Sequence, residues 1–388
     1  MEPAFVTDEL FAYCVETRRR IHRRPEVGFD LPETAALVAE ELEKFGIAHT
    51  ERFGTCSVVG YIGNDPDKKT LCLRADMDAL PITEKTDLPY ASEIPGKMHA
   101  CGHDSHTAIL LTAGRILHGM EKELPCNVRL LFQPSEEGEV SGAKMMVDHG
   151  VMDGADAALC IHCENALEHG RIGIRYGNYQ AACIPVTIRF FGRSAHAAMA
   201  ETGVDALTMA VESYGKLKEL VKREAGADIP YVWNVGSFHA GAAHNAVPDF
   251  CEQKISFRYY DQAFAERVME KTAALCDTIA LSFGGRAEMD WHVSAYPVIN
   301  NDAIVTQFTQ ACRDGGLAVD ELPRRMSSED FCWYLTKAPG AIFRFGTRNE
   351  SMGCTALAHH ADFCIDESGM RAGIAALVRF ARAFGAQS

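Results

Sequence analysis

Short apolar runs alternate with amphipathic stretches along much of this chain, and this alternation most restricts the folds that it can adopt. Residues 70–73, 128–132 and 157–161 have the length and apolar content of buried strands, and residues 106–117 have the spacing of a helix. Strands that alternate with helices are typical of an α/β fold, in which helices cover a mostly parallel sheet. The sequence therefore predicts layered α/β structure around these residues.

The ends of the chain extend the same pattern. Residues 5–21 and 32–44 are expected to form helices before the first strand, and residues 341–345 and 369–384 a late strand and a closing amphipathic helix. Since a single core rarely grows past ~250–300 residues, a chain of 388 residues is expected to form two domains.

The pattern of the sequence changes near residue 180. Apolar and polar residues alternate over residues 184–190 and again over 255–259, as in strands with one solvated face. Amphipathic helices are expected over residues 204–221 and 264–279, and further strands over 231–238 and 289–293. We interpret residues 180–294 as a smaller α+β domain. It interrupts a discontinuous main domain of residues 1–179 and 295–388.

Composition argues against two classes of partner. Lys and Arg number 38 and Asp and Glu 53, and a formal net charge of -15 would repel a nucleic acid. No apolar stretch approaches the ~18 residues of a membrane span, and the start lacks the basic and apolar regions of a signal peptide. The 14 cysteines are scattered, which predicts mostly free thiols in a reducing cytoplasm.

Polar residues follow the predicted buried strands, at the edge where open α/β sheets place their sites. Asp76 and Asp78 come after the first of these strands. Cys101 and His103 stand two residues apart, so that in an extended stretch both side chains point to the same side. A thiolate and an imidazole together suit a borderline-soft divalent ion. Taken alone, these residues also fit a turn with two acids and a buried cysteine beside surface histidines.

Three later segments add donors of the same kind. Glu136 and Glu137 are adjacent on a predicted turn, where one carboxylate can bind a metal and the other can reach a neighbouring water. His162 ends an apolar strand, and a histidine pair occupies residues 359–360. Each segment alone fits an ordinary acidic turn or a structural histidine. Together they could hold two metal ions ~3.5–4 Å apart, which can activate a water and polarise a carbonyl.

These motifs resemble those of peptidase family M20, in particular its amidohydrolase subfamily of hippurate hydrolases, N-acyl-amino-acid amidohydrolases and auxin-conjugate hydrolases. The matching segments are residues 19–26, 74–81, 99–106, 132–138, 192–196 and 328–331. The resemblance implies a three-layer α/β metal-dependent hydrolase domain, interrupted by a smaller α+β lid domain through which the chains form a homodimer.

The resemblance also assigns roles to individual residues. It implies five metal ligands, namely Cys101, His103, Glu137, His162 and His359, with Cys101 bridging two ions. Glu136 would be the general base, and His196 on the lid would stabilise the oxyanion, often in the neighbouring subunit's site. Asn245 would bind substrate, and Asp76 and Asp78 would orient the ligands.

The activity implied is hydrolysis of N-acyl amino acids to a carboxylic acid and an amino acid, by a metal-bound hydroxide with a glutamate base. Two divalent ions per subunit are expected; mixed Cys, His and Glu ligation suits Mn or Zn, and also Co or Ni. A dipeptidase or aminopeptidase of the wider family is the alternative. A non-catalytic metal-binding relative would have lost the base or ligands, and all six residues are present.

Two departures from the family pattern concern substrate selectivity. The family often has proline after the histidine pair, where this chain has Ala361. The lid histidine is often followed by Met-Pro-His, where this chain has Met199, Ala200 and Glu201. The second change places an acid near the expected substrate entrance, so the preferred substrate does not follow from the resemblance.

Overall fold

The computed structural model describes residues 5–386, which form two compact units. The first unit runs through Tyr179 and continues over Val298–Arg324 and from Asp330 onward. The second unit comprises Gln180–Pro297 and the short segment Arg325–Glu329. That segment packs with the second unit because the Ala181 N–H donates to the Ser327 carbonyl at 2.9 Å.

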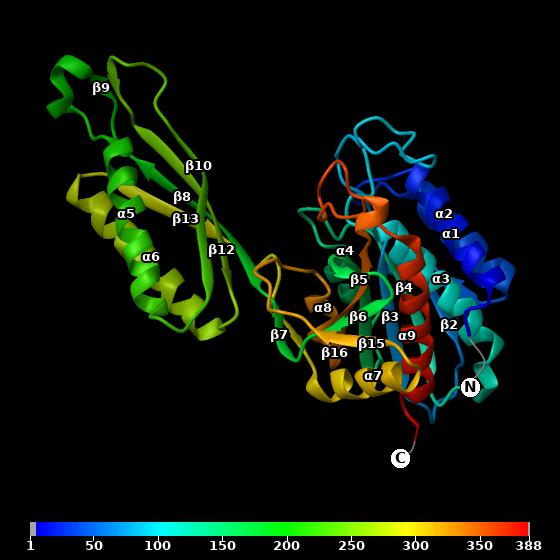
Figure 1. The fold of residues 1–388 in the computed structure, drawn as a ribbon. Helices are drawn as coiled ribbons and strands as arrows, with labels where there is room; N and C mark the ends of the chain where they lie inside the picture. Colours follow the sequence, from blue (N-terminus) through cyan, green and yellow to red (C-terminus); the bar gives the residue numbers. More distant parts are fainter. Residues whose placement is uncertain (1–4, 387–388) are drawn as a thin grey trace. The chain divides into compact units, whose positions relative to one another are not determined.

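An eight-stranded mixed sheet forms the centre of the first unit (Figure 1). In spatial order its strands are β1 (Ala48–Thr50), β2 (Val58–Ile62), β4 (Asn127–Gln133), β3 (Thr70–Asp76), β5 (Ala157–Glu168), β16 (Gly340–Arg348), β6 (Arg171–Ile174) and β15 (Ala318–Glu321). The four central strands, β4, β3, β5 and β16, are parallel. Their carboxyl ends therefore meet at one edge of the sheet.

Helices cover both faces of this sheet, as the alternation of strands and helices predicts. Figure 1 shows α1 (Asp8–Arg23), α2 (Pro32–Phe45) and α3 (His103–Gly119) on one side. On that side α3 also packs against α9 (Met370–Ala383), which contacts α7 (Asp302–Asp314). The short helices α4 (Gly142–Asp148) and α8 (Cys332–Leu335) lie on the other side. The α/β class expected from the sequence is confirmed.

Local chemistry explains where the first helices begin and end. The Thr7 hydroxyl accepts the N–H of Leu10 and starts α1. Pro32 is the first residue of α2, where its missing N–H has no cost. Gly46 ends α2 in the left-handed conformation, with φ 76°, and the N–H groups of Gly46 and Ile47 donate to the carbonyls of Glu43 and Leu42.

The remaining elements of the first unit are short. They are the strands β7 (Gly177–Gln180), which ends at the first residue of the second unit, and β14 (Val298–Asn300), and the 3-10 turns η1 (Glu121–Glu123), η3 (Glu350–Met352) and η4 (Glu367–Gly369). The strands β1, β2, β6 and β15 were not expected from the sequence. They are three to five residues long, too short for a clear alternation of apolar and polar residues.

The second unit is a four-stranded antiparallel sheet covered by two helices. The strand order is β10 (Tyr231–Ala240), β12 (Phe250–Tyr259), β8 (Ala182–Phe191) and β13 (Arg286–Trp291), and the helices are α5 (Ala206–Ala225) and α6 (Gln262–Ser282). Every second residue of β8 is buried, because one face of the sheet packs against these helices. Beyond β8, the strands β9 (Ala195–His196) and β11 (Ala246–Val247) pair beside the turn η2 (Ala197–Thr202).

Within the described residues, no helix is both long enough and apolar enough to cross a membrane.

Candidate metal centre

The proposed ligands of the first unit gather at the carboxyl edge of its parallel strands. Asp76 is the last residue of β3, and Glu136 and Glu137 follow the end of β4. His162 lies within β5 rather than at its end, because β5 continues in register with β16 as far as Glu168. The strand order thus brings together residues that are far apart in the sequence.

A tight turn places Cys101 and His103 at the start of α3. Gly102 between them has φ 79°, in the left-handed region that favours glycine. A Cβ atom at this position would lie 2.5 Å from the sulfur of Cys163, so no larger residue fits. His103 is consequently the first residue of the buried helix, and Cys101 precedes it on the turn.

Potential ligand atoms converge in several overlapping groups, within each of which all atoms lie within 4.8 Å of one another. Three of these groups are Cys101 with His103 and His162, Cys101 with Glu137 and His359, and His103 with Glu136 and Glu137. Cys101, His103 and Glu137 each belong to two of these three groups. Among them, the thiolate of Cys101 can contact two ions at once through one sulfur atom, which is the arrangement that a bridging ligand needs.

Hydrogen bonds orient both buried histidines toward this convergence. His103 Nδ1 lies 2.8 Å from the Asp78 carbonyl oxygen, and His162 Nδ1 lies 2.8 Å from the Cys163 carbonyl oxygen. A carbonyl oxygen only accepts, so in the neutral form of each ring Nδ1 carries the proton and Nε2 has a free lone pair. His162 Nε2 lies 3.5 Å from the Cys101 sulfur. His103 Nε2 is buried and has no hydrogen-bond partner among residues 5–386.

His106 lies against the same histidines, but its ring is already fully bonded. Its Nδ1 donates to Asp76 Oδ1 across 2.5 Å, and its Nε2 accepts the backbone N–H of Cys163 at 2.9 Å. No lone pair remains for a metal ion. His106 is therefore a structural group that holds Asp76 and the β5 backbone in place.

Asp78 organises the turn that carries the two glutamates. Its carboxylate oxygens accept the backbone N–H groups of Glu136 and Glu137, each at 3.0 Å. Ser135, just before them, has φ 49°, an uncommon conformation for a residue other than glycine. These contacts direct the paired carboxylates to the side of His103, whose Nε2 is 3.9 Å from Glu136 Oε2 and 4.0 Å from Glu137 Oε1.

His359 reaches the cluster from the loop after β16. Its Nε2 lies 3.0 Å from Glu137 Oε1, and its backbone N–H donates to the Ala100 carbonyl at 2.8 Å. Its φ of 70° is again in the left-handed region. Such backbone conformations persist only where surrounding contacts hold them, and they are frequent in functional loops.

Negative charge dominates the interior of this cluster. Burial by itself lowers the pKa of His103, but the carboxylates of Asp76, Asp78 and Glu137 outweigh it and raise the pKa to about 10. Burial opposes ionisation of Asp76, yet Arg74 and the histidines hold its pKa well below the usual range. Arg74 donates to Asp76 Oδ2 at 2.6 Å. A site that favours a proton on buried His103 also favours a metal cation in its place.

The donor set fits a divalent metal ion. A thiol, imidazole nitrogens and carboxylates are the groups that bind Zn²⁺ and similar ions in proteins. The unpartnered Nε2 of His103 faces carboxylates in a buried position, where an unbonded polar atom is otherwise costly. Each candidate histidine also has the outer hydrogen bond that fixes the tautomer of a metal ligand, except for His359 on its exposed loop.

The other two candidate residues lie in the second unit, next to each other. His196 pairs with Ala246 between β9 and β11, and the Ala197 N–H donates to the Asn245 carbonyl at 3.0 Å. The backbone N–H of Ala198 donates to His196 Nδ1 at 3.1 Å. Nδ1 is therefore the acceptor, and the neutral ring carries its proton on Nε2.

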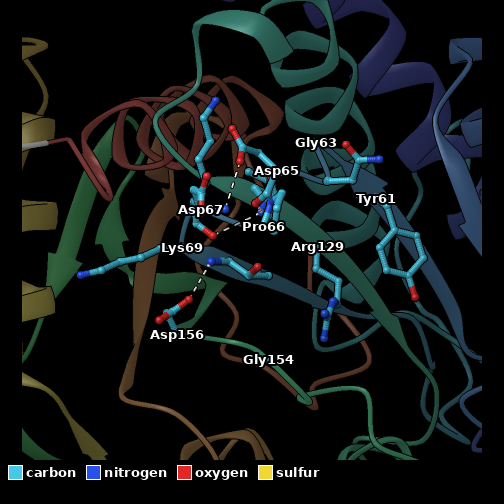
Figure 2. Close-up of a pocket in the computed structure, with 14 residues that line it drawn as sticks. Tyr61, Gly63, Asp65, Pro66, Asp67, Lys69, Arg129, Gly154 and Asp156 are labelled. Carbon is cyan, nitrogen blue, oxygen red and sulfur yellow. Dashed lines mark hydrogen bonds between the residues drawn. The ribbon is translucent and has the colours of Figure 1, made fainter.

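A polar hollow of about 540 Å³ lies at the opposite edge of the main sheet. Thr70, Asn127 and Asp156, which begin or precede β3, β4 and β5, line it together with the loop around Asp65 (Figure 2). The Thr70 N–H donates to Asp156 at 2.8 Å, so that these groups satisfy each other. No candidate ligand lines this hollow, and it is separate from the candidate metal centre.

Two residues of the centre received no role from the sequence. His106 stands three positions after His103, and this helical spacing could have indicated that both rings lie on one face. Asn165 donates to the carbonyls of Ala356 at 2.7 Å and Cys364 at 2.8 Å, and so holds the loop of His359. No local pattern could have revealed Asn165, because its partners are about 200 residues away in the sequence.

The chain is similar to proteins of one known family. Residues 72–383 match the sequence profile of peptidase family M20/M25/M40. Thermostable carboxypeptidase 1 from Saccharolobus solfataricus is 32% identical over 94% of this chain and 93% of that protein. N-acetyl-L-cysteine deacetylase from Bacillus subtilis is 33% identical over 91% and 83%, respectively.

A solved structure agrees with the sequence relatives. It is described as a dinuclear metal-binding peptidase of the M20 family from Bacillus subtilis. Its TM-score is 0.86, its identity 28%, and the match covers 97% of this chain and 98% of that one. The chain therefore belongs to peptidase family M20/M25/M40 and is a metal-dependent amide hydrolase.

Proposed function

We propose that this protein hydrolyses N-acyl amino acids with two divalent metal ions, held by the five residues named from the resemblance. These are Cys101, His103, Glu137, His162 and His359. The observation that carries the proposal is the membership of Cys101 in two groups of donors, one with His103 and His162 and one with Glu137 and His359. Two groups with one shared thiol match what a pair of ions with a bridging ligand requires.

The metal ions and the protein's own side chains have separate roles in the reaction. Bound metal ions supply Lewis-acid polarisation of the amide carbonyl and lower the pKa of water. Glu136 takes the proton from the attacking water and returns it to the leaving nitrogen. His196, with its proton on Nε2, donates to the oxygen that becomes negatively charged. The orienting contacts of Asp78 keep Glu136 and Glu137 in their separate roles.

Substrate selection falls to residues other than the metal ligands, since a metal pair acts on any amide that reaches it. Asn245 can donate its side-chain amide to the α-carboxylate of the amino acid that leaves. A site built for such a hydrogen bond rejects analogues that lack it, because its polar atoms stay unpaired. N-acetyl-L-cysteine deacetylase, one of the relatives, supports an N-acyl amino acid as the substrate class.

The carboxypeptidase relative favours one variant of this function. In a carboxypeptidase substrate the acyl group is itself a peptide, and the leaving amino acid again carries a free α-carboxylate. A dipeptidase or aminopeptidase instead needs a free α-amine on the other side of the bond. The two ends of the substrate therefore distinguish these activities.

The test is a substrate panel with metal-free protein to which Mn, Zn, Co or Ni is added. We expect N-acetyl and longer acyl derivatives of free amino acids to be cleaved, and the corresponding carboxamides far more slowly. We expect a chelator to abolish the activity and a divalent ion to restore it. Full activity of protein that is metal-free by elemental analysis would contradict the proposal.

Variants at Asn245 complete this test. Asn245→Ala is expected to lower kcat/KM for the free acid and to leave kcat/KM for the carboxamide nearly unchanged. Equal rates for the acid and the carboxamide with unaltered protein would point to a general amidase. Cleavage only of peptides with a free amino terminus would point to an aminopeptidase or dipeptidase.

A further inference from the structure

Two cysteines lie at the two ends of the loop segment that carries His359. Cys354 and Cys364 are both free thiols, and their sulfur atoms are 3.2 Å apart. His359 is five residues from each of them. The other sulfurs that lie near the centre have different contacts: Cys163 donates to the Cys101 carbonyl.

Hydrogen bonds hold the backbone where the two ends of the segment meet. Cys354 exchanges two backbone hydrogen bonds with Asn349, at 2.9 and 3.0 Å. The side-chain amide of Asn165 donates to the carbonyls of Ala356 and Cys364, and its oxygen accepts the Thr347 hydroxyl. The two cysteines are thus held opposite each other by contacts that do not involve their sulfurs.

One thiol of the pair is suited to react with an oxidant. Cys364 is partly exposed, whereas Cys354 is only 4% exposed. The hydrogen bond between the sulfurs lowers the pKa of Cys364 to about 7, against the effect of burial, and the charge of Arg18 adds to this. The same hydrogen bond raises the pKa of Cys354. Glu84, His22 and Asp366 are the other titratable groups that act on the pair.

We propose that Cys354 and Cys364 are a redox-responsive pair. Exchange with a low-molecular-weight disulfide joins the two cysteines in a disulfide bond, which locks the segment between them. The Cys364 thiolate attacks one sulfur of the small disulfide, and one small thiolate leaves. The Cys354 sulfur then attacks Cys364 in the mixed disulfide, and the second small thiolate leaves. The two thiol protons pass to the two released thiolates, and two protein thiols are oxidised while one small disulfide is reduced.

The lock requires little rearrangement of the loop. The sulfurs must close from 3.2 Å to the ~2.05 Å of a disulfide, which side-chain rotation supplies while the hydrogen-bonded backbone stays in place. Closing this covalent loop removes open conformations of residues 355–363. The further consequence for the metal rests on the proposed role of His359 as a ligand: a locked segment releases its ion more slowly.

The first experiment measures the bond itself, without any substrate. Metal-loaded protein is incubated with oxidised glutathione, quenched with acid, alkylated, digested and analysed by mass spectrometry. We expect a peptide pair that links Cys354 to Cys364 and that dithiothreitol separates. Alkylation of both cysteines, or a separate glutathione adduct on each, would overturn the proposal.

The second experiment measures the lock by hydrogen exchange of the backbone amides in residues 355–363. Exchange is expected to slow by about tenfold or more on oxidation, given the usual effect of closing a short loop. Cys364→Ser and Cys354→Ser should abolish the difference, and Cys183→Ser, at a thiol of similar exposure, should preserve it. Equal exchange in the two redox states of unaltered protein would overturn the lock.

A measurement of the rate of metal release distinguishes a failure of this inference from a failure of the proposed function. The transfer of metal to a chromogenic chelator should be slower from oxidised than from reduced protein, and equal in the two serine variants. If exchange slows on oxidation while metal release does not change, His359 is not a ligand, and the redox pair stands on the first two measurements alone.

Discussion

His103 donates its Nδ1 proton to the backbone carbonyl of Asp78 across 2.8 Å, and the carboxylate of the same Asp78 accepts the N–H groups of Glu136 and Glu137. One buried aspartate thereby orients the imidazole at the start of α3 and the two carboxylates that follow β4. Since a metal ligand must point in a fixed direction, this shared support determines how the candidate centre is arranged.

Replacing the Asp78 carboxylate should weaken metal binding although Asp78 is not itself in the donor groups. In Asp78→Asn the side-chain NH₂ group cannot accept a hydrogen bond, so one backbone N–H of the glutamate turn loses its partner. We expect metal affinity to fall by about 10–100-fold, the usual effect of losing an outer hydrogen bond. Titration with a metal-sensitive dye measures this affinity, and Asp148→Asn, at an exposed side chain of α4, is the control. Unchanged affinity would contradict the orienting role.

Replacing each of the two adjacent glutamates by glutamine should impair a different property of the protein. Glu136→Gln should keep its metal ions and bind substrate but lose turnover by ~10²–10⁴-fold, because a general acid–base group is missing. Glu137→Gln should lose metal, since Glu137 is the acid that lies 3.0 Å from His359. Metal content and kcat of both variants decide the matter, and the opposite result would exchange their roles.

Cys101 should be the one cysteine whose loss empties the centre. Cys101→Ala removes a thiol that belongs to two of the donor groups, one with His103 and His162 and one with Glu137 and His359, so both metal content and activity should fall. Cys14→Ala and Cys276→Ala remove buried thiols elsewhere and should leave the metal content unchanged. Elemental analysis of the three purified variants is the measurement. Equal metal content in all three would reject a bridging thiol.

Asn165 should affect the metal through the loop that it holds. Asn165→Ala removes the two hydrogen bonds donated to Ala356 and Cys364 and the one accepted from the Thr347 hydroxyl, and we expect faster metal release and a loss of about 1–3 kcal/mol in unfolding free energy. Asn300→Ala is a matched control, because Asn300 also donates to two carbonyls inside the first unit, those of Arg175 and Ile342. The Asn300→Ala variant should lose a similar amount of unfolding free energy, and its rate of metal release should stay unchanged. Equal release from both variants would remove the special role of Asn165.

The second unit should supply His196 to the site of a neighbouring copy in a homodimer. Neither Glu136→Gln nor His196→Ala homodimers should turn over substrate at the normal rate. Mixed dimers would combine an intact glutamate with an intact histidine in one of their sites, and part of the activity should return. Activity that stays low, although native mass spectrometry detects mixed dimers, would mean that His196 does not act across subunits.

The sequence alone determined the α/β class and the residue types available to the site. Apolar runs of strand length and amphipathic stretches of helix length are set by burial and by local backbone preference, so they can be read over 5 to 20 neighbouring residues. The donors Cys101, His103 and Glu137 were recognisable for a related reason. Glu137 follows a predicted strand, and the carboxyl ends of parallel strands share an edge. Cys101 and His103 stand two residues apart before a predicted helix, although the structure places them on a tight turn rather than in an extended stretch.

The tertiary structure alone decided which of these groups are free to bind. His103 and His106 occupy one helical turn, yet only His103 has an unbonded nitrogen, because the second nitrogen of His106 accepts the Cys163 N–H. Cys354 and Cys364 lie side by side in the loop that Asn165 holds. This contact depends on the pairing of β16 with β5, two segments about 180 residues apart in the sequence. Strand order and hydrogen-bond direction arise from long-range packing, which local sequence patterns do not encode.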